Sequence, residues 1–535
     1  MAEPDPYPEE METLSADVLV IGGGATGAGV AWDAALRGLK VVLVDRHDLA
    51  QGTSGRFHGL LHSGGRYVVK DPIAAAECAA ENAILRRVAA ACIEDTGGLF
   101  VTTPDDEAGY ADGFAAACAA TGVPCQEIDT AQALREEPRL NPRISRAFRV
   151  PDANIDVWKA VWALADGARR HGAQVLPYHA VVSISREQDT VTGARVRDAR
   201  SGAELEIEAR VTVNATGAWA GEIAALAGIE GVRVLPGRGI MIAMNHRLVN
   251  TVVNRCAMPG DGDILVPIRT VSVIGTTDEL TDDPDDQTVD PREVQRMLDD
   301  GEKLVPGFRQ TRALRVWTGV RPLFEDTKAP NARAGGPARV ETRNVTRAHA
   351  LLDHAERDGV GGFVTITGGK LTTYRLMAEQ TVDAVSAQLG RGGVPCSTAA
   401  TPLPGSETGE HYRLSDRLAH KEQTPDEQVI CECELVTRTQ LEQEIASDPD
   451  GDLDDLRRRL RLGMGPCQGG FCMYRAAGVM HSCGADTARA NAALLAFAQE
   501  RRKGVAPILY GDQLRQSQLD EWILTGVLDV EGLPT

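Results

Sequence analysis

Apolar and polar positions near the start of the chain follow the order strand, turn, helix, strand. DVLVIG begins at Asp17, a glycine-rich turn follows, AGVAWDAALRG has apolar positions at helical spacing, and KVVLVD ends at Asp45. Short apolar runs bounded by glycine are typical of buried strands, whereas a period near 3.6 residues is typical of a helix. The pattern therefore predicts a βαβ unit over 17–45, the building block of a parallel sheet.

Later segments predict more strands and one further helix. Strands of the same sheet are expected where apolar or alternating runs recur, at 173–184, 190–197 and 204–214. The stretch 154–172 has helical spacing, and we expect Asn154 to cap that helix and Gly172 to end it. Strand-rich segments at 236–277 and 315–324 predict a second, mixed or antiparallel sheet interleaved with the first.

A compositional break separates the last part of the chain from the rest. RGGVPCSTAATPLPGSETGE, residues 391–410, is dense in Gly, Pro, Ser and Thr, which is typical of a linker. The chain has 535 residues, and single hydrophobic cores stop growing near roughly 250–300 residues. We therefore expect two or three domains, the last of them a separate C-terminal module.

The charge balance is acidic and excludes some partners. Asp plus Glu number 76 against 56 for Lys plus Arg, which gives a net charge of -20. Such a charge repels nucleic acid and argues against a basic membrane-binding face. No run approaches the roughly 18 apolar residues of a membrane helix, and the N-terminal sequence is unlike a signal peptide. We expect a cytoplasmic chain whose membrane association comes through a partner.

The first turn carries a nucleotide-binding motif. Gly22, Gly24 and Gly27 form GxGxxG directly after a strand and at the start of a helix. The first glycine allows a tight turn, the second lets the backbone approach a pyrophosphate, and the third packs the helix on the sheet. Asp45 ends the next strand, where a carboxylate can accept both hydroxyls of an adenosine ribose. The motif predicts a dinucleotide site without separating NAD from FAD.

Three further segments favour FAD. DLAQGTSGRFHGLLHSGGRY (48–67) resembles the flavin-contacting segment of the amino-acid-oxidase type of FAD enzyme, VNATGAWA (213–220) resembles their second signature, and GGKLTTYRLMAEQTVDAV (368–385) is expected to begin a helix near the flavin. A helix N-terminus there stabilises the negative charge of a reduced flavin. The additional cofactor-binding candidates in these segments are Thr53, Ser54, Gly217, Gly369, Leu371 and Thr372.

Four cysteines predict a cluster or a metal site. Cys431 and Cys433 form CxC, and Cys467 and Cys472 form CxxxxC. Thiolate pairs favour iron–sulfur clusters or zinc, but CxC is atypical of zinc. The arrangement resembles the [2Fe-2S] module of bacterioferritin-associated ferredoxin, although that module has a shorter final pair. Zinc and unligated thiols remain the alternatives, while an odd total of 11 cysteines does not suggest a disulfide framework.

Several motifs together carry a specific resemblance. IGTTDE (274–279), WTGVRPL (317–323) and GGKLTTYR (368–375), with LLHSGGRY upstream, are similar to the FAD-dependent glycerol-3-phosphate dehydrogenase family. The similarity runs over about 15–390. The cysteine module and the tail GVAPILYGDQLRQSQLDEWI narrow the resemblance to the catalytic A subunits of the anaerobic, multi-subunit form.

The resemblance implies a function. It is oxidation of sn-glycerol 3-phosphate to dihydroxyacetone phosphate by hydride transfer to FAD, after which electrons leave through a [2Fe-2S] cluster to partner subunits and quinone. The implied partners are membrane-anchoring and electron-transfer subunits, with no nucleic acid and no membrane span in this chain. The implied location is cytoplasmic, peripheral to the inner face of the cell membrane.

The chemistry of that substrate selects candidate catalytic residues within the matched motifs. Guanidinium groups bind a phosphate dianion bidentately, so Arg66 and Arg321 are candidates, with Lys370 as a point charge near the reacting hydroxyl. Arginines in an acidic protein also form ordinary ion pairs, which is the alternative for each. His62 is the candidate general base, or else a hydrogen-bonding fixture near the flavin. The neighbouring Arg56 and Phe57 replace residues that are small in relatives.

The fold class expected from this assignment is α/β. A Rossmann-like FAD-binding domain is interleaved with a mixed or antiparallel-sheet substrate domain, and a small helical [2Fe-2S] domain follows. The expected bounds are 15–75, 150–235 and 355–390 for the FAD-binding domain, 76–149 and 236–354 for the substrate domain, 391–425 for the linker, 426–490 for the [2Fe-2S] domain and 491–535 for the tail.

Two other functions fit the same motifs. An FAD-dependent amino-acid or hydroxy-acid dehydrogenase with the same cluster domain would bind a carboxylate in place of a phosphate. A non-catalytic flavin and iron–sulfur protein would transfer electrons without oxidising a substrate.

The acidity generates a prediction about salt. Runs such as DELTDDPDD (278–286) suit adaptation to concentrated salt, where screening relieves self-repulsion; an ordinary acidic protein is the alternative. Salt adaptation predicts a melting temperature that rises continuously with KCl towards molar concentrations. A thermal melt followed at increasing KCl checks this, and a flat curve would end the hypothesis.

Overall fold

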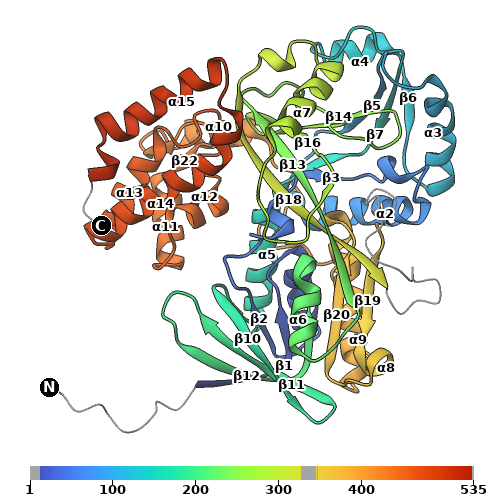
Figure 1. Cartoon of the computed structure of the whole chain (residues 1–535), viewed down its shortest axis with the longest axis vertical. Helices are drawn as coiled ribbons and strands as arrows, with labels where there is room; N and C mark the ends of the chain where they lie inside the picture. Colours follow the sequence, from blue (N-terminus) through green and yellow to red (C-terminus); the bar gives the residue numbers. More distant parts are fainter. Residues whose placement is uncertain (1–11, 327–344, 346, 533–535) are drawn as a thin grey trace. The chain divides into compact units, whose positions relative to one another are not determined.

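The protein divides into two compact units in a computed structural model that describes residues 12–326, 345 and 347–532. Unit 1 comprises Met1–Gly55, Ala160–Pro236 and Arg321–Glu407, and unit 2 comprises Arg56–Lys159, Gly237–Val320 and Thr408–Thr535. Figure 1 shows the course of the chain through both.

Unit 1 is built on an eight-stranded sheet in the order β10-β11-β12-β1-β2-β9, with β20 on β12 and β19 on β20. The parallel strands are β1 (Glu12–Ile21), β2 (Val41–Val44), β9 (Gln174–Leu176), β12 (Glu204–Asn214) and β20 (Phe363–Gly368). The antiparallel additions are β10 (His179–Glu187), β11 (Thr190–Asp198) and β19 (His349–Asp353). The predicted strands are therefore confirmed, and they meet as one mixed sheet.

The helices of this region supply the crossovers that parallel strands require. They are α1 (Ala25–Leu36), α5 (Val157–Arg170), α6 (Ala220–Leu226), α8 (His354–Asp358) and α9 (Tyr374–Gln388). The predicted βαβ unit over 17–45 is confirmed as β1, α1 and β2. Nearly all of α1 is buried, because the adjoining α9 contacts it through Gly29, where Tyr374 leaves no room for a side chain.

The predicted cap of α5 is wrong. Asn154 lies in β8 (Ala153–Ile155), where its side-chain amide donates to the Gly59 carbonyl at 3.0 Å. Asp156 takes the capping position instead, since its carboxylate accepts the Lys159 N–H at 3.2 Å. Gly172 does end the helix, with a positive φ of 89°.

Unit 2 contains the predicted second sheet, which has nine strands in the order β17-β13-β16-β15-β14-β5-β7-β6, with β18 on β13. The pairs are antiparallel except for β14 with β5, so the sheet is mixed. Its strands are β5 (Gly98–Thr102), β6 (Gln126–Ile128), β7 (Arg146–Val150), β13 (Val232–Met244), β14 (Val252–Arg255), β15 (Ile264–Ile268), β16 (Val271–Gly275), β17 (Glu279–Leu280) and β18 (Ala313–Asp326).

A smaller sheet and three helices complete this part of unit 2. The sheet has the order β3-β8-β4, with β3 (Leu60–Leu61), β8 and β4 (Ile93–Glu94). The helices are α2 (Pro72–Val88), α3 (Ala108–Thr121) and α4 (Thr130–Glu136). Residues 56–75 belong to unit 2, in contrast to the predicted domain bounds, because β3 pairs with β8 and Gly65 packs against Phe100.

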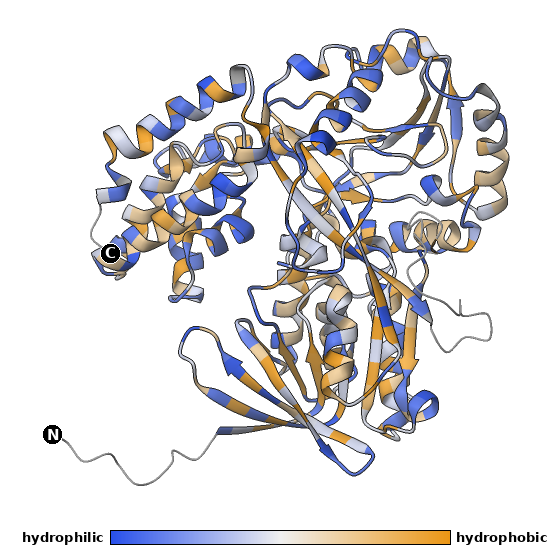
Figure 2. Ribbon diagram, viewed as in Figure 1, coloured by the Kyte–Doolittle hydropathy of each residue, from blue (hydrophilic) through white to orange (hydrophobic). Residues whose placement is uncertain are grey.

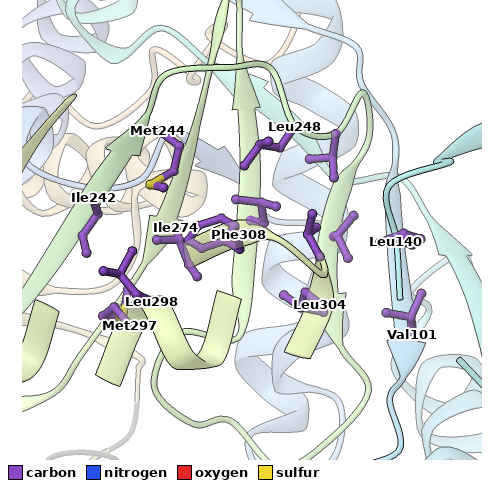
Figure 3. Packing of buried hydrophobic residues seen from close by; sticks show 14 of the residues in the cluster. Val101, Leu140, Ile242, Met244, Leu248, Ile274, Met297, Leu298, Leu304 and Phe308 are labelled. Carbon is purple, nitrogen blue, oxygen red and sulfur yellow. The ribbon is translucent and has the colours of Figure 1, made fainter. Parts of the chain in front are cut away.

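One helix shows how the sequence pattern builds the core of unit 2. Helix α7 (Pro291–Leu304) begins after the capping carboxylate of Asp290 and buries Val294, Met297 and Leu298 at helical spacing. These side chains pack with Phe308 against the sheet (Figure 3). The visible face of α7 is mostly hydrophilic in Figure 2.

The C-terminal part of unit 2 has a hydrophobic core of its own. Its elements are β21 (Val429–Cys431), β22 (Val436–Thr437), α11 (Arg438–Ser447), α12 (Leu453–Leu460), α13 (Cys472–Ser482), α14 (Thr487–Val505) and α15 (Asp512–Trp522). Helix α10 (Leu414–Gln423) lies within the predicted linker. Within the described residues, no helix is both long and apolar enough to span a bilayer.

Candidate cofactor and substrate sites

The first glycine turn closes by direct backbone contact in unit 1. Gly22 has a φ of 108°, and a Cβ there would lie 2.7 Å from the carbonyl oxygen of Ala215, just after β12. A Cβ on Gly27 would lie 1.8 Å from the Gly22 carbonyl oxygen. Only glycine fits both positions, so the turn, the start of α1 and the end of β12 approach as closely as backbones can.

The N-terminus of α1 presents donors at this turn. The Ala25 N–H donates to the hydroxyl of Ser54 at 3.0 Å, and Gly24 supplies no side chain of its own. Ser54 and Thr53 lie in the short helix η1 (Thr53–Gly55), which follows β2 at the same edge of the sheet. A helix N-terminus with a bare glycine and nearby hydroxyls fits a pyrophosphate.

Asp45 lies at the end of β2, as predicted. Its carboxylate accepts the Gly23 N–H at 2.7 Å and the His47 N–H at 2.9 Å. Burial raises its pKa from 3.8 to about 6, although these two hydrogen bonds act in the opposite direction. Beside it, the Arg46 guanidinium lies 4.6 Å from the centre of the Trp219 ring.

The other flavin-binding candidates belong to unit 1 as well. Gly217 begins the short helix η4 (Gly217–Trp219), and its carbonyl accepts the Thr367 hydroxyl at 3.1 Å. Gly369, with a φ of 68°, precedes the turn η7 (Leu371–Thr373) that leads into α9. Thr372 is buried in that turn, whereas Leu371 is half-buried.

Two cationic candidates also lie in unit 1. The Lys370 ammonium donates to the Arg347 carbonyl at 3.0 Å, directly before η7. Arg321 is half-buried on β18. Their predicted contacts with a phosphorylated substrate stay predictions.

Arg66, in unit 2, is strongly engaged. Its guanidinium pairs with the buried carboxylate of Asp263 at 2.6 Å and donates to the Gly260 carbonyl at 3.4 Å. Burial opposes the charged form, but the charge and the hydrogen bond of Asp263 keep the pKa of Arg66 above the ordinary range. The ion-pair alternative for Arg66 therefore has a specific partner.

His62 shares its neighbourhood with a second histidine. The two ring centroids of His62 and His58 are 6.0 Å apart, and Tyr67 lies 5.4 Å from His62 on another side. His58 is buried, and its Nδ1 accepts the Leu60 N–H at 3.3 Å, so a neutral His58 carries its proton on Nε2. His62 is half-buried, and its backbone carbonyl accepts the Asn82 amide at 3.1 Å.

The four predicted cysteine ligands converge in unit 2. The thiol of Cys431 contacts that of Cys472, and the thiol of Cys467 contacts those of both Cys433 and Cys472. Hydrogen bonds from the neighbouring thiols lower the pKa of Cys431 and that of Cys467. Such a set loses protons readily, as ligation of iron requires.

Backbone N–H groups surround these sulfurs. Glu434 and Gly463 donate to Cys431, and Gly469 and Phe471 donate to Cys467. A Cβ on Gly465 would lie 2.3 Å from that of Cys433, so the glycine-rich loop approaches the thiols closely. N–H donors to sulfur and a close backbone fit an iron–sulfur cluster. In the described part of the chain, no three or more His, Cys, Asp or Glu side chains form a site for a single metal ion.

Comparison with protein families defines the class. The family model for FAD-dependent oxidoreductases matches residues 17–375, and the model for BFD-like [2Fe-2S] binding domains matches residues 429–482. The protein is thus a flavin oxidoreductase with an iron–sulfur module. The FAD and [2Fe-2S] predictions are confirmed, and the match decides against zinc and unligated thiols.

Full-length relatives narrow the class. The A subunit of anaerobic glycerol-3-phosphate dehydrogenase from Escherichia coli K12 is 44% identical over 97% of this chain and 98% of its own. The A1 subunit of the Haloferax volcanii enzyme is 41% identical over 97% of this chain and 92% of its own. The chain belongs to the family of anaerobic glycerol-3-phosphate dehydrogenase A subunits.

A solved structure supports the fold. The FAD complex of glycerol-3-phosphate dehydrogenase from Bacillus halodurans matches with a TM-score of 0.63 at 20% identity, covering 93% of this chain and 96% of that one.

Proposed function

We propose that the protein oxidises sn-glycerol 3-phosphate at C2 to dihydroxyacetone phosphate and passes the electrons to partner subunits. The observation that carries the proposal is the similarity along 97% of the chain to relatives named for this activity. When bound, FAD supplies a two-electron hydride acceptor, and the [2Fe-2S] cluster supplies a one-electron carrier. The glycine turn with Asp45 and Ser54 would hold FAD, and the four cysteines would hold the cluster.

Arg321 and Lys370 are proposed to recognise the substrate. A planar guanidinium such as that of Arg321 binds a phosphate dianion through two parallel hydrogen bonds. The Lys370 ammonium already reaches a backbone carbonyl at the start of η7 and can exchange that acceptor for a substrate oxygen. Arg66 is proposed to contribute less, because Asp263 neutralises its charge.

His62 is proposed as the group that takes the proton from the C2 hydroxyl. Its half-buried ring keeps access to solvent, whereas the ring of His58 is buried and held by a backbone donor. A neutral imidazole is the base best matched to neutral pH.

The partners are proposed to be two further kinds of chain, one for electron transfer and one for membrane anchoring, with quinone as the final acceptor. The relatives are named as one lettered component of a dehydrogenase, which supports an assembly with other chains. This chain would then be peripheral to the inner face of the membrane through those partners.

Anaerobic bleaching of the flavin tests the proposed reaction. The purified chain with both cofactors should lose its oxidised-flavin absorbance on addition of glycerol 3-phosphate and keep it with glycerol, which lacks the phosphate. Bleaching by sarcosine, proline or 2-hydroxyglutarate in place of glycerol 3-phosphate would replace the proposal with an amino-acid or hydroxy-acid dehydrogenase. No bleaching by any of these substrates would favour a non-catalytic electron-transfer protein.

Substitution of Arg321 tests the phosphate contact. Arg321→Gln should lower kcat/KM for glycerol 3-phosphate by about 10- to 100-fold, since a hydrogen bond to a charged group contributes roughly 1.5–3 kcal/mol. Arg292→Gln is the control, because Arg292 is 91% exposed and pairs with Asp290 beside it. Equal activity of the two variants would remove Arg321 from the site.

The pKa of Asp45 predicts a pH dependence of FAD affinity. Ribose hydroxyls donate to the ionised carboxylate, so binding below a pKa of about 6 must release a proton, whereas binding above it need not. FAD affinity should therefore fall by up to about tenfold per pH unit below pH 6 and be level above it. Fluorescence titration of the apoprotein checks this. The Asp45→Asn variant should bind FAD more weakly at pH 7 and without that slope, and an unchanged slope would contradict the assignment.

A further inference from the structure

Two arginines and two carboxylates form a closed ion-pair network inside unit 2. Arg269 contacts Glu434 at 3.0 Å and Asp156 at 3.2 Å, and Arg461 contacts the same two carboxylates at 3.3 Å and 3.7 Å. The Glu434 side chain is 0% exposed, and the other three are nearly buried. The charges alternate and sum to zero.

The network joins two parts of unit 2 that are far apart in sequence. Glu434 and Arg461 belong to the cluster module, which we define as residues 429–482. Arg269 lies in the two-residue turn between β15 and β16, and Asp156 caps α5. The ring of Tyr412 lies 4.3 Å from the Arg269 guanidinium and packs beside the network. The network is thus a contact between the cluster module and the framework of the second sheet.

Glu434 also touches the cluster site itself. Its backbone N–H donates to the sulfur of Cys431, while its side chain binds both arginines. One residue therefore connects the ligand loop to the framework. A shift of the arginines displaces the backbone that carries this donor.

Both arginines adopt backbone conformations that are unfavourable for them. Arg269 has a φ of 49°, and Arg461 has a φ of 62° at the C-cap of α12, where glycine is usual. Glycine would adopt either conformation at lower cost. Strained residues persist where their surroundings hold them, and here the guanidinium groups supply that hold.

A buried ion-pair network is a better positioning device than a source of stability. Burial of charges costs desolvation that their attraction roughly offsets, so an apolar contact would bind as well. An apolar contact tolerates sliding, whereas four alternating charges match in one register only. The choice of charges over apolar side chains points to a requirement for a fixed position.

We infer that Glu434 is a positioning residue that fixes the cluster module on the second sheet through Arg269, Arg461 and Asp156, so that electrons enter the cluster at a set distance. The inference rests on the proposed function for the source of those electrons. Electron-transfer rates fall steeply with distance, so a module that can shift receives electrons more slowly. Substrate oxidation does not use this contact and should not depend on it.

Glu432 provides a matched control. It lies between the ligands Cys431 and Cys433, carries the same charge as Glu434, and pairs with Arg475 at 2.5 Å. Its side chain is 60% exposed, and Arg475 belongs to the module itself. Glu432→Gln and Glu434→Gln thus remove the same charge next to the same ligands, but only the second opens the contact.

The test uses the full chain with both cofactors, and iron content is measured for each variant. Glu434→Gln and Arg269→Gln should increase amide exchange over 429–437 and 264–272 by about tenfold or more, since removal of one partner from a buried pair is strongly destabilising. Cluster reduction, followed by EPR and visible absorbance after the flavin is reduced, should slow by about tenfold. Flavin bleaching by substrate should be unchanged, and Glu432→Gln should match wild type in every measurement.

The outcomes separate this inference from the proposed function. If glycerol 3-phosphate does not bleach the wild-type flavin, the proposed function fails, and light-driven flavin reduction still measures electron entry into the cluster. If Glu434→Gln lacks iron, Arg269→Gln decides, because it leaves the module's sequence intact. Wild-type exchange and cluster reduction in Arg269→Gln would overturn the inference. So would an equal effect of Glu432→Gln, which would indicate charge and not position.

Discussion

The close approach of three backbone segments at the first glycine turn is the constraint on which unit 1 depends. A methyl group at Gly27 would lie 1.8 Å from the Gly22 carbonyl oxygen, and one at Gly22 would contact the backbone after β12. Because these positions carry no side chain, β1, α1 and β12 meet at one edge of the sheet. That edge is where the N-terminus of α1, the Ser54 hydroxyl and the Asp45 carboxylate lie together. A dinucleotide site follows from packing that only glycine permits.

The cluster module solves a different physical problem. A domain of its size buries little apolar surface, so it gains stability from ligands that cross-link it and from contacts with its surroundings. Four thiols that contact one another, with backbone donors on the sulfurs, provide the first. Arginines provide the second, since Arg269 and Arg461 share Glu434, and Arg312 donates to the Pro466 carbonyl at 3.0 Å. In a chain with a net charge of -20, cations are thus concentrated where position matters.

Local patterns gave the predictions that agree with the structure. The βαβ unit, the end of α5 at Gly172 and the start of α9 after GGKLTTYR depend on residues within a few turns of one another. The capping role expected of Asn154 failed because its amide meets the Gly59 carbonyl, 95 positions away along the chain. The pairing of Arg66 with Asp263 and the burial of His58 beside His62 likewise depend on segments brought together by the fold. No short-range signal distinguishes them.

The sequence by itself determined the cofactors and the family, because glycine turns and paired cysteines act through the chain's immediate geometry. Spacing of two to five residues suffices to place a phosphate cradle or a thiolate pair. The tertiary structure alone decided which charges are neutralised and which residues hold the module in place. Glu434 and Arg269 are 165 positions apart and look like ordinary surface residues in the sequence. Burial and pairing of charges are properties of the assembled fold, since they depend on the segments that exclude water around them.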